Sequence, residues 1–538
     1  MKLSYEGLLD RNGWEKAGVQ LPEFDCKAMV AATEEAPTWV HIGAGNIFRA
    51  FIARAQQKLL NEGLVKSGIV AVSTHNAHII NKVYKPYDNM CVLVGLRADG
   101  TMRKEVIASV ADSLTVNKDY PQDREKLKQV FRNPSLQMVS FTITEKGYAL
   151  KDLHDNYLPL VEADFAAGPD GCAHGMCLTA AMLYERFKAC GAPVAVVSMD
   201  NCSHNGEKVR SSVVTVAEKW LENGFVTAEF VAWVKDEKNV SFPWSMIDKI
   251  TPRPAQAIAE ALAADGIEGM EIVETSRNKY DSAFVNAEEP EYLVIEDNFP
   301  NGRPPLEKAG IYLTDRDTVN NTEKMKVTTC LNPLHTTLAV YGCLLGFKTI
   351  ASEMKDPELK KLVERIGYQE GLPVVVDPGI IRPVDFIDEV LTRRLPNPFM
   401  PDTPQRIATD TSQKVGVRFG ETIKSYIANP DKDVTSLTYI PLAIAGWLRY
   451  LVAVDDNGEA MTCSSDPMLE VLQSQLDGVT LGDPDSVSGK LEPILSNVSL
   501  FGVDLVRAGL SGKIEEQLRK LLAGPGAVRA TLKEYLAD

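Results

Sequence analysis

Two lysines, an asparagine and a histidine lie within a largely apolar, helical stretch, KMKVTTCLNPLHTTL, residues 324–338. Oxidation of an alcohol without a metal needs a base that takes the hydroxyl proton as the hydride leaves. A lysine desolvated among apolar neighbours can be that base, because burial disfavours its charged form. We predict that Lys326 is the base, that Asn332 donates to the developing alkoxide, and that His335 holds a neighbouring hydroxyl.

A second candidate is HIGAGNIFRAF, where Gly43 and Gly45 follow the strand-like TWVHI and precede a helix. Glycines there let the backbone approach a pyrophosphate, and the helix N-terminus supplies N–H donors. The third glycine of the usual fingerprint is replaced by Phe48. A purely structural turn between strand and helix is the alternative.

The next strand-like run, GIVAVSTHN, ends in Ser73, Thr74 and His75 instead of the acidic residue that usually binds a ribose. These side chains can hydrogen-bond a ribose but do not repel a 2′-phosphate as a carboxylate would. These residues therefore leave the choice of cofactor, NAD or NADP, open. The residues that we assign to its site are Gly43, Gly45, Asn46, Phe48, Arg49, Ser73 and Thr74.

Polar residues also follow two later strand-like runs. Glu145 follows one run, and Asp200, Asn201 and Asn205 follow another. An open parallel sheet presents its ligand face at the carboxyl ends of its strands, although caps and turns would explain the same residues. Further on, Arg406 and Lys414 lie in the polar stretch RIATDTSQK and suit a carboxylate or a polyol, or are ordinary surface charges.

The elements that must position these residues fall into two groups. Up to about residue 315, short apolar runs alternate with amphipathic helices, which predicts an α/β, Rossmann-type, doubly wound domain over residues 1–315. Residues 316–538 carry helical spacing almost throughout and predict a mostly α-helical domain. At the boundary, Asn320 with Glu323 resembles a capping box.

Composition limits the partners. The chain has 538 residues, 24% of them charged and 45% hydrophobic, and a formal net charge of −16. This charge argues against nucleic-acid and anionic-membrane partners, and no window reaches the ~18 apolar residues of a membrane span. We predict a cytoplasmic protein, a monomer or small homo-oligomer, that acts on a small molecule.

No metal site is predicted. The nine cysteines do not form a compact disulfide framework, and we expect them to be reduced. The only cluster, Cys172, His174 and Cys177, lacks a second ligand pair at zinc spacing. A loop that leads into a helix explains it without a metal.

Seven segments, taken in order, resemble the polyol-specific long-chain dehydrogenases, the family of mannitol 2-dehydrogenase, fructuronate reductase and tagaturonate reductase. They span most of the chain and are HIGAGNIFRAF, TITEKGY, SMDNCSHNGE, FPWSMIDKITP, VIEDNFPNGRPP, EKMKVTTCLNPLHT and RIATDTSQK. FPWSMIDKITP departs from the family signature at Ile247 and Lys249, where valine and arginine are usual.

The resemblance implies a Rossmann-type domain, a helical domain, and metal-independent hydride transfer in the cleft between them. It maps the catalytic lysine, an oxyanion-stabilising asparagine and the substrate-binding histidine onto Lys326, Asn332 and His335. A second asparagine maps onto Asn201, preferred to Asn205. Other family roles map as follows: Asp248 near the substrate, Arg406 and Lys414 at its far end, Glu145 and Glu323 in proton exchange with solvent.

The family pattern has four residues between lysine and asparagine, whereas Lys326 and Asn332 have five between them. On an ideal helix, at ~100° per residue, Lys326 and His335 would point in opposite directions, and Lys324 would face His335 better. We choose Lys326 because EKMK keeps the family's spacing from glutamate to lysine. Pro333, where relatives usually have glycine, favours a local bulge that restores the face.

The function that this resemblance implies is NADH-dependent, reversible reduction of D-fructuronate to D-mannonate. Tagaturonate reduction and mannitol oxidation are the alternatives within the family, because Arg406 and Lys414 also occur in relatives that act on neutral polyols. An alternative of another class is a dinucleotide-binding regulator that has lost turnover. Against it, the chain keeps a base, amide donors and a histidine together.

Overall fold

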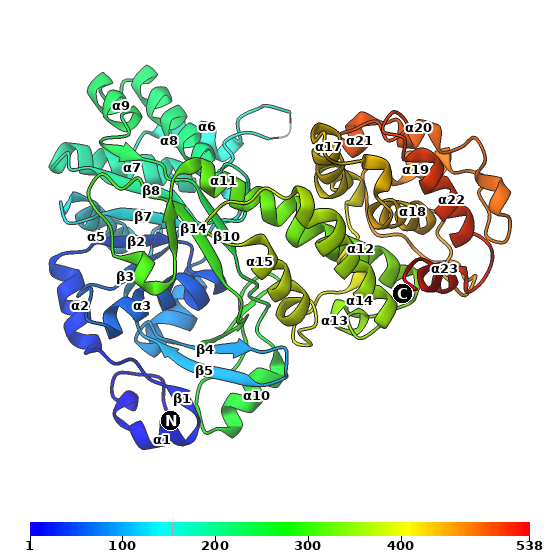
Figure 1. Ribbon diagram of the computed structural model, residues 1–538. Helices are drawn as coiled ribbons and strands as arrows, with labels where there is room; N and C mark the ends of the chain where they lie inside the picture. The colour runs from blue at the N-terminus through cyan, green and yellow to red at the C-terminus, as the bar shows by residue number, and fades with distance from the viewer. Residues whose placement is uncertain (153, 538) are drawn as a thin grey trace. The chain divides into compact units, whose positions relative to one another are not determined.

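The computed structural model describes residues 1–152 and 154–537. The chain divides into two compact units, which we call unit 1 (residues 1–97 and 101–320) and unit 2 (residues 98–100 and 321–538). Unit 1 is built on a Rossmann-type parallel sheet and unit 2 is helical, so the predicted fold class is confirmed (Figure 1). No helix among the described residues is long and apolar enough to cross a membrane.

The main sheet of unit 1 has six parallel strands in the order β6-β3-β2-β7-β8-β9. Their bounds are β2 Trp39–Ile42, β3 Ile69–Ser73, β6 Val110–Thr115, β7 Met138–Phe141, β8 Val194–Ser198 and β9 Val240–Ser241. The strand order reverses beside β2, which is the switch point of the sheet. Because the strands are parallel, the carboxyl ends of β2, β3 and β7 lie on the same side of the sheet. Ligands of open parallel sheets bind at the carboxyl ends of the strands beside the switch point.

Both faces of this sheet are buried. Val40 and Ile42 pack on one face with helices α5 (Pro121–Arg132), α7 (Gly175–Ala189) and α8 (Asn205–Glu222). Trp39 packs on the other face with helix α3 (Ala53–Asn61) and with residues of the smaller sheets. Successive strand residues point to opposite faces, which is why these strands read as continuous apolar runs.

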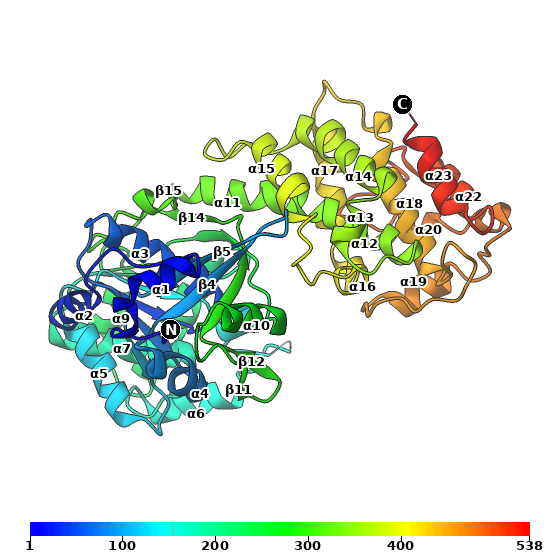
Figure 2. The ribbon, with the colours of Figure 1, turned by 90° about the horizontal axis from the view of Figure 1, so that it is seen from below.

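Three smaller sheets complete unit 1, and several of their strands are visible in Figure 2. The first has the order β1-β5-β4-β13 and the second the order β10-β14-β15, while β11 and β12 form a hairpin. The bounds are β1 Val19–Gln20, β4 Cys91–Leu96, β5 Met102–Ile107, β10 Ser245–Asp248, β11 Val273–Ser276, β12 Lys279–Asp281, β13 Phe284–Glu288, β14 Tyr292–Glu296 and β15 Tyr312–Thr314. The remaining helices of unit 1 include α1 Arg11–Lys16, α2 Cys26–Glu35, α4 Ala77–Ile79, α6 Pro159–Ala167, α9 Ala228–Lys235 and α10 Gln256–Ala264.

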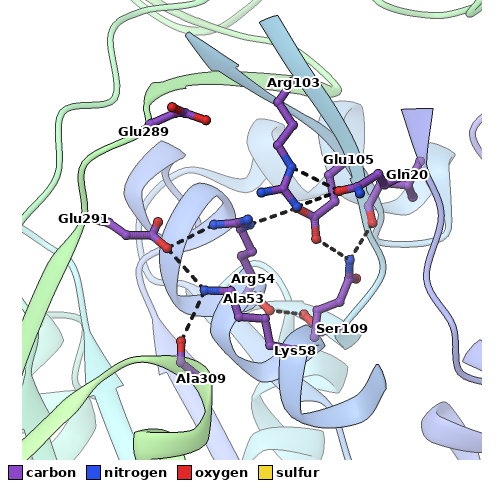
Figure 3. Close-up of polar contacts among 12 residues, drawn as sticks. Gln20, Ala53, Arg54, Lys58, Arg103, Glu105, Ser109, Glu289, Glu291 and Ala309 are labelled. Carbon is purple, nitrogen blue, oxygen red and sulfur yellow. Dashed lines mark hydrogen bonds and ion pairs between the residues drawn. The ribbon is translucent and has the colours of Figure 1, made fainter. Parts of the chain in front are cut away.

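An ion-pair network fixes helix α3 to the smaller sheets (Figure 3). Arg54 pairs with Glu105 at 2.9 Å and with Glu291 at 3.0 Å. Glu291 also lies 3.3 Å from Lys58 and 3.0 Å from Lys249, whose side chain is only 3% exposed. One carboxylate, that of Glu291, therefore forms ion pairs with three cations, two of them on the helix that follows the glycine turn.

Helix α11 (Arg316–Met325) joins unit 1 to unit 2, and a π-helical turn, Lys326–Cys330, follows it. The helices beyond this turn are α12 Asn332–Leu344, α13 Ile350–Glu353, α14 Pro357–Glu364, α15 Pro383–Glu389, α16 Pro404–Ile407, α17 Glu421–Ala428, α18 Tyr439–Leu451, α19 Leu469–Gln475, α20 Glu492–Leu495, α21 Val498–Phe501, α22 Ser511–Leu521 and α23 Ala527–Tyr535. Among the residues described after β15, only isolated bridges have β geometry.

The core of unit 2 is built around α12 and α18, which pack on each other, and α18 also packs on α22. Glu370 fixes the start of α18, because its carboxylate accepts from the backbone N–H groups of Thr438, Tyr439 and Ile440. This buried carboxylate satisfies the N–H donors that a helix start leaves without an internal partner.

The predicted capping box at Asn320 and Glu323 is wrong. Helix α11 begins four residues earlier, at Arg316, so Asn320 lies inside it. Asp315 is the capping residue: its carboxylate accepts from the Thr318 N–H at 2.8 Å. Because Asp315 already caps the helix one turn before Asn320, Asn320 lies in the helix interior and cannot act as the cap.

Candidate active site

A cavity of about 290 Å³ lies at the carboxyl ends of β2, β3 and β7 in unit 1. Four of the residues predicted to bind the cofactor line it: Gly43, Gly45, Ser73 and Thr74. His75 and Asn76 continue the wall after β3, and residues 142–144 form the wall after β7. The arrangement is that of a dinucleotide site at the switch point of a doubly wound sheet.

The two glycines at this cavity have different roles. Gly43 has a φ of 122°, and a Cβ there would lie 2.3 Å from the Thr142 carbonyl oxygen. A Cβ on Gly45 would meet no protein atom within 4 Å. Gly43 is therefore needed for the turn itself, whereas Gly45 leaves the backbone open to the cavity. An open backbone at a helix start fits a pyrophosphate.

Asn46, Phe48 and Arg49 are not among the residues that line the cavity. Phe48 is fully buried and stacks on His41 with ring centroids 4.2 Å apart. The buried Arg49 guanidinium donates to the Ser282 carbonyl at 2.6 Å and to Asn46 Oδ1 at 2.7 Å. These three side chains hold the helix start in place from behind.

Asp200 shapes the end of β7, a role that the sequence reading missed. Its carboxylate accepts from the Ile143 and Thr144 N–H groups at 2.8 and 3.0 Å and from the Tyr148 hydroxyl at 2.5 Å. Thr144 has a φ of 69°, so these bonds hold a strained turn. Burial raises the pKa of Asp200, although the three hydrogen bonds oppose this effect. No pattern in the sequence marked this contact, because two of its three donors are backbone N–H groups.

The two asparagines after β8 differ sharply in environment. Asn205 is fully buried; its amide donates to the Ser245 and Asp200 carbonyls, and its oxygen accepts from the Ser245 N–H at 2.9 Å. Asn201 is exposed at the end of the strand. Asn205 thus joins the β8 loop to β10, which ends at the buried Asp248. Glu145 lies at the surface and pairs with Lys208.

The candidate lysine belongs to unit 2. The side chain of Lys326 is 2% exposed, whereas that of Lys324 is exposed. Lys326 begins the π-helical turn, and its carbonyl accepts from the Leu331 N–H at 3.1 Å. This turn is the predicted local bulge, which is confirmed. Glu323 lies in the preceding helix, one turn before Lys326.

His335 lies in α12 within a set of positive charges. Its Nε2 is buried, without a hydrogen-bond partner among the described residues, and lies 3.6 Å from Asp402 Oδ2. Burial, and next the charges of Arg418, Arg406, Arg394 and Lys414, lower the pKa of His335 to about 3. The imidazole is therefore neutral at neutral pH and can donate or accept a hydrogen bond. Half-buried Asn332 begins the same helix.

Two of these cations, Arg394 and Arg418, were not predicted. Arg418 donates to the Thr336 hydroxyl, next to His335, and Arg406 pairs with Asp402. The pKa of Lys414 is lowered, first by burial and next by the charge of Arg418. The only sequence signal for Arg418 was its position four residues after Lys414, one helical turn away.

The cluster Cys172, His174 and Cys177 has a structural explanation. His174 precedes α7, and its Nδ1 accepts from the Met176 N–H at 3.3 Å. Cys172 Sγ lies 3.3 Å from the Pro169 carbonyl oxygen. Over residues 1–152 and 154–537, no group of three or more His, Cys, Asp or Glu side chains could hold a metal ion.

Two family models match most of the chain. Residues 37–308 match the model of the mannitol dehydrogenase Rossmann domain, and residues 318–522 match that of the mannitol dehydrogenase C-terminal domain. The chain is 54% identical, over all of its own length and 99% of the relative's, to D-mannonate oxidoreductase of Thermotoga maritima.

Two solved structures are similar over nearly their full length. D-sorbitol dehydrogenase in substrate-free form is 27% identical with a TM-score of 0.77, and the match covers 96% of this chain and 98% of the other. Mannitol 2-dehydrogenase of Pseudomonas fluorescens, solved with NAD and D-mannitol, is 27% identical with a TM-score of 0.68, and the match covers 100% and 99%.

Fold, cavity and family models together define a dehydrogenase that binds a nicotinamide dinucleotide and acts on a secondary alcohol. More specifically, the chain belongs to the mannitol dehydrogenase family, as its sequence segments indicated. A nicotinamide dinucleotide, when bound, would supply the hydride acceptor or donor. The residues that would hold it are those of the unit 1 cavity.

The contrast between the two glycines can be tested. Gly45→Ala is expected to leave the unfolding midpoint unchanged and to raise the Kd for NADH by about tenfold or more, about 1.4 kcal/mol, because the new Cβ projects into the cavity. Gly43→Ala is expected to lower the free energy of unfolding by about 1–3 kcal/mol, because it strains the turn. NADH fluorescence titration and urea unfolding of both variants measure these effects. Equal behaviour of the two variants would contradict the assignment.

Proposed function

We propose that the protein is an NAD(H)-dependent, metal-independent oxidoreductase that interconverts D-fructuronate and D-mannonate, with Lys326 as general acid and base. The 54% identity to a D-mannonate oxidoreductase over the full chain supports the substrate. Tagaturonate reduction to altronate and mannitol oxidation are the alternatives. A regulator without turnover is disfavoured, because it would have no chemical need to keep a base, amide donors and a histidine together.

The observation that carries the proposal is the environment of His335. Four cationic side chains act on this neutral imidazole, and Asp402 is the carboxylate that lies beside it at 3.6 Å. Arg394 and Arg418 add positive charge to that of Arg406 and Lys414, and such a concentration of charge suits a substrate that carries a carboxylate of its own, as hexuronates and aldonates do. Asp410 and Asp466 offset part of this charge at Lys414. We assign Arg406 and Lys414 to that end of the substrate.

In the proposed mechanism, neutral Lys326 accepts the proton of the mannonate C5 hydroxyl as the hydride leaves the same carbon. Asn332 and the exposed Asn201 donate hydrogen bonds to the alkoxide, where negative charge develops. His335 and Asp248 orient neighbouring hydroxyl groups. Glu145 and Glu323 pass the proton between the lysine and solvent. In the reducing direction, protonated Lys326 returns the proton to the carbonyl oxygen.

The test is the absorbance of NADH at its nicotinamide band while the purified protein is offered fructuronate, tagaturonate and fructose in parallel. Rapid oxidation with fructuronate is expected. Oxidation with fructose alone would assign the protein to mannitol oxidation, and oxidation with tagaturonate alone to altronate formation. No oxidation with any of the three would favour the regulator.

The pH dependence separates Lys326 from His335. Oxidation of mannonate should become faster as pH rises, because only neutral Lys326 accepts a proton, and reduction of fructuronate should become slower. Because the pKa of His335 is lowered to about 3, its imidazole is neutral from about pH 5 to 9 and adds no inflection there. We expect one inflection, below the ~10.4 of free lysine. A flat profile with hydride transfer rate-limiting would contradict the proposal.

A further inference from the structure

The wall of the nucleotide cavity that follows β3 is completed by another element. In dinucleotide-binding folds an acidic side chain at this place holds the ribose 2′-hydroxyl and disfavours a 2′-phosphate. Here Ser73, Thr74 and His75 occupy it, and the hairpin β11–β12 adds Lys279 and Asp281 to the same cavity. The charged side chains at this wall of the cavity therefore come from the hairpin, whereas the polar side chains come from the end of β3.

The hairpin is fixed to the end of β3 by hydrogen bonds. Asn76 Nδ2 donates to the Thr275 hydroxyl at 3.3 Å, and Lys82 Nζ donates to the Glu274 carbonyl at 3.0 Å. Asn76 itself closes the turn after β3, because its N–H donates to the Ser73 hydroxyl at 3.2 Å. The hairpin is consequently held beside the carboxyl end of β3.

The two charges on the hairpin are not equivalent. Asp281 accepts from the Thr275 hydroxyl at 2.5 Å and lies 3.9 Å from the buried Arg49 guanidinium, so its charge is largely neutralised within the protein. Lys279 is exposed and has no ion-pair partner among the described residues. Its positive charge reaches His75: the pKa of that imidazole is lowered by burial and next by Lys279. The uncompensated charge at this wall is positive.

We propose that Lys279, with the Thr74 hydroxyl and the His75 imidazole, forms a 2′-phosphate subsite, so that the protein binds NADP(H) as well as NAD(H). A lysine is a common point-charge ligand for phosphate. The subsite requires that the cavity bind a nicotinamide dinucleotide, and to that extent it rests on the proposed function. It does not depend on which sugar acid the protein acts on. Lys279 acts as a specificity residue and takes no part in proton or hydride transfer.

The experiment measures binding without substrate, so that it is independent of which sugar acid is turned over. Kd values for NADPH and NADH are determined by fluorescence titration for the wild type, Lys279→Met and Arg277→Met. Arg277 is the matched control, because it lies in the turn of the same hairpin and carries the same charge but does not line the cavity. Thermal unfolding of each variant checks that the hairpin variants fold.

The wild type is expected to bind NADPH within about tenfold of NADH. Lys279→Met is expected to raise the Kd for NADPH by about tenfold to a hundredfold, the usual worth of a hydrogen bond to a charged group, and to change that for NADH less than about twofold. Arg277→Met should change neither the Kd for NADPH nor the Kd for NADH by more than about twofold. Wild-type binding of NADPH more than about a hundredfold weaker than NADH, or equal losses for both nucleotides in Lys279→Met, would overturn the proposal.

Discussion

Replacing Lys326 with methionine is expected to lower kcat by a factor of about 10² to 10⁴, the range that general acid–base catalysis supplies. Methionine keeps most of the length of the buried side chain, which is 2% exposed, but cannot take up or release a proton. The Kd for NADH, measured separately, should remain unchanged. The loss should therefore appear in kcat and not in nucleotide binding.

The matched control is Lys324→Met, which removes an exposed lysine two residues away and should leave kcat within about twofold. A second readout is chemical rescue: added primary amines should restore part of the activity of Lys326→Ala. If Lys324→Met lost the activity and Lys326→Met kept it, the base would be Lys324 and the class of enzyme would stand. If both variants kept full activity, the lysine mechanism itself would be wrong.

The irregular helix geometry at Lys326 was partly predictable from the spacing between Lys326 and Asn332. An ideal helix turns by ~100° per residue, so one extra residue before Asn332 would rotate the lysine away from its partners. A π-helical turn closes a hydrogen bond to the fifth residue and so absorbs one inserted residue. The structure has this turn at Lys326–Cys330, directly before the α12 helix that Pro333 helps to start. The irregularity was predictable from proline and spacing, whereas its π-helical form was not.

The parallel sheet was also predictable, because the segments that form β2, β3 and β8 are mainly apolar along their whole length. This pattern is typical of strands that are buried on both faces of a sheet. The side chains around the cavity were less so. Phe48 and Arg49 lie three and four residues after Gly45, but the first helical turn points them into the core. Periodicity does not reveal the face of a helix that is buried all round.

Residues that come from distant parts of the chain were the hardest to find. Arg394 and Arg418 belong to two different π-helical turns, and their charges act on His335 only because unit 2 folds as it does. Lys279 reaches the cavity through a hairpin more than 200 residues after β3. No local pattern marks a lone arginine or lysine as part of a site, because most of them are solvated surface charges.

Replacing Glu291 with glutamine is expected to lower the free energy of unfolding by about 3–5 kcal/mol, the usual cost of removing one partner from a buried ion pair. Lys249, at 3% exposure, would lose the carboxylate 3.0 Å away, and Arg54 and Lys58 would lose the same partner. Urea unfolding followed by circular dichroism measures the change. The control is Glu125→Gln, which breaks an ion pair with Arg132 at a half-exposed site and should cost less than about 1 kcal/mol.

The same variant has a predicted pH signature. Burial alone would raise the pKa of Glu291, but Lys249, Arg54 and Lys58 outweigh it, so the pKa is lowered in the folded protein. A lowered carboxylate pKa gives stabilisation that is present above the unfolded value of about 4.3 and is lost as pH falls through the folded value. The difference in stability between wild type and Glu291→Gln should therefore be largest near neutral pH and shrink in acid. A difference that stays constant from pH 7 down into that range would show that packing, and not charge, makes Glu291 important to the helix behind the nucleotide site.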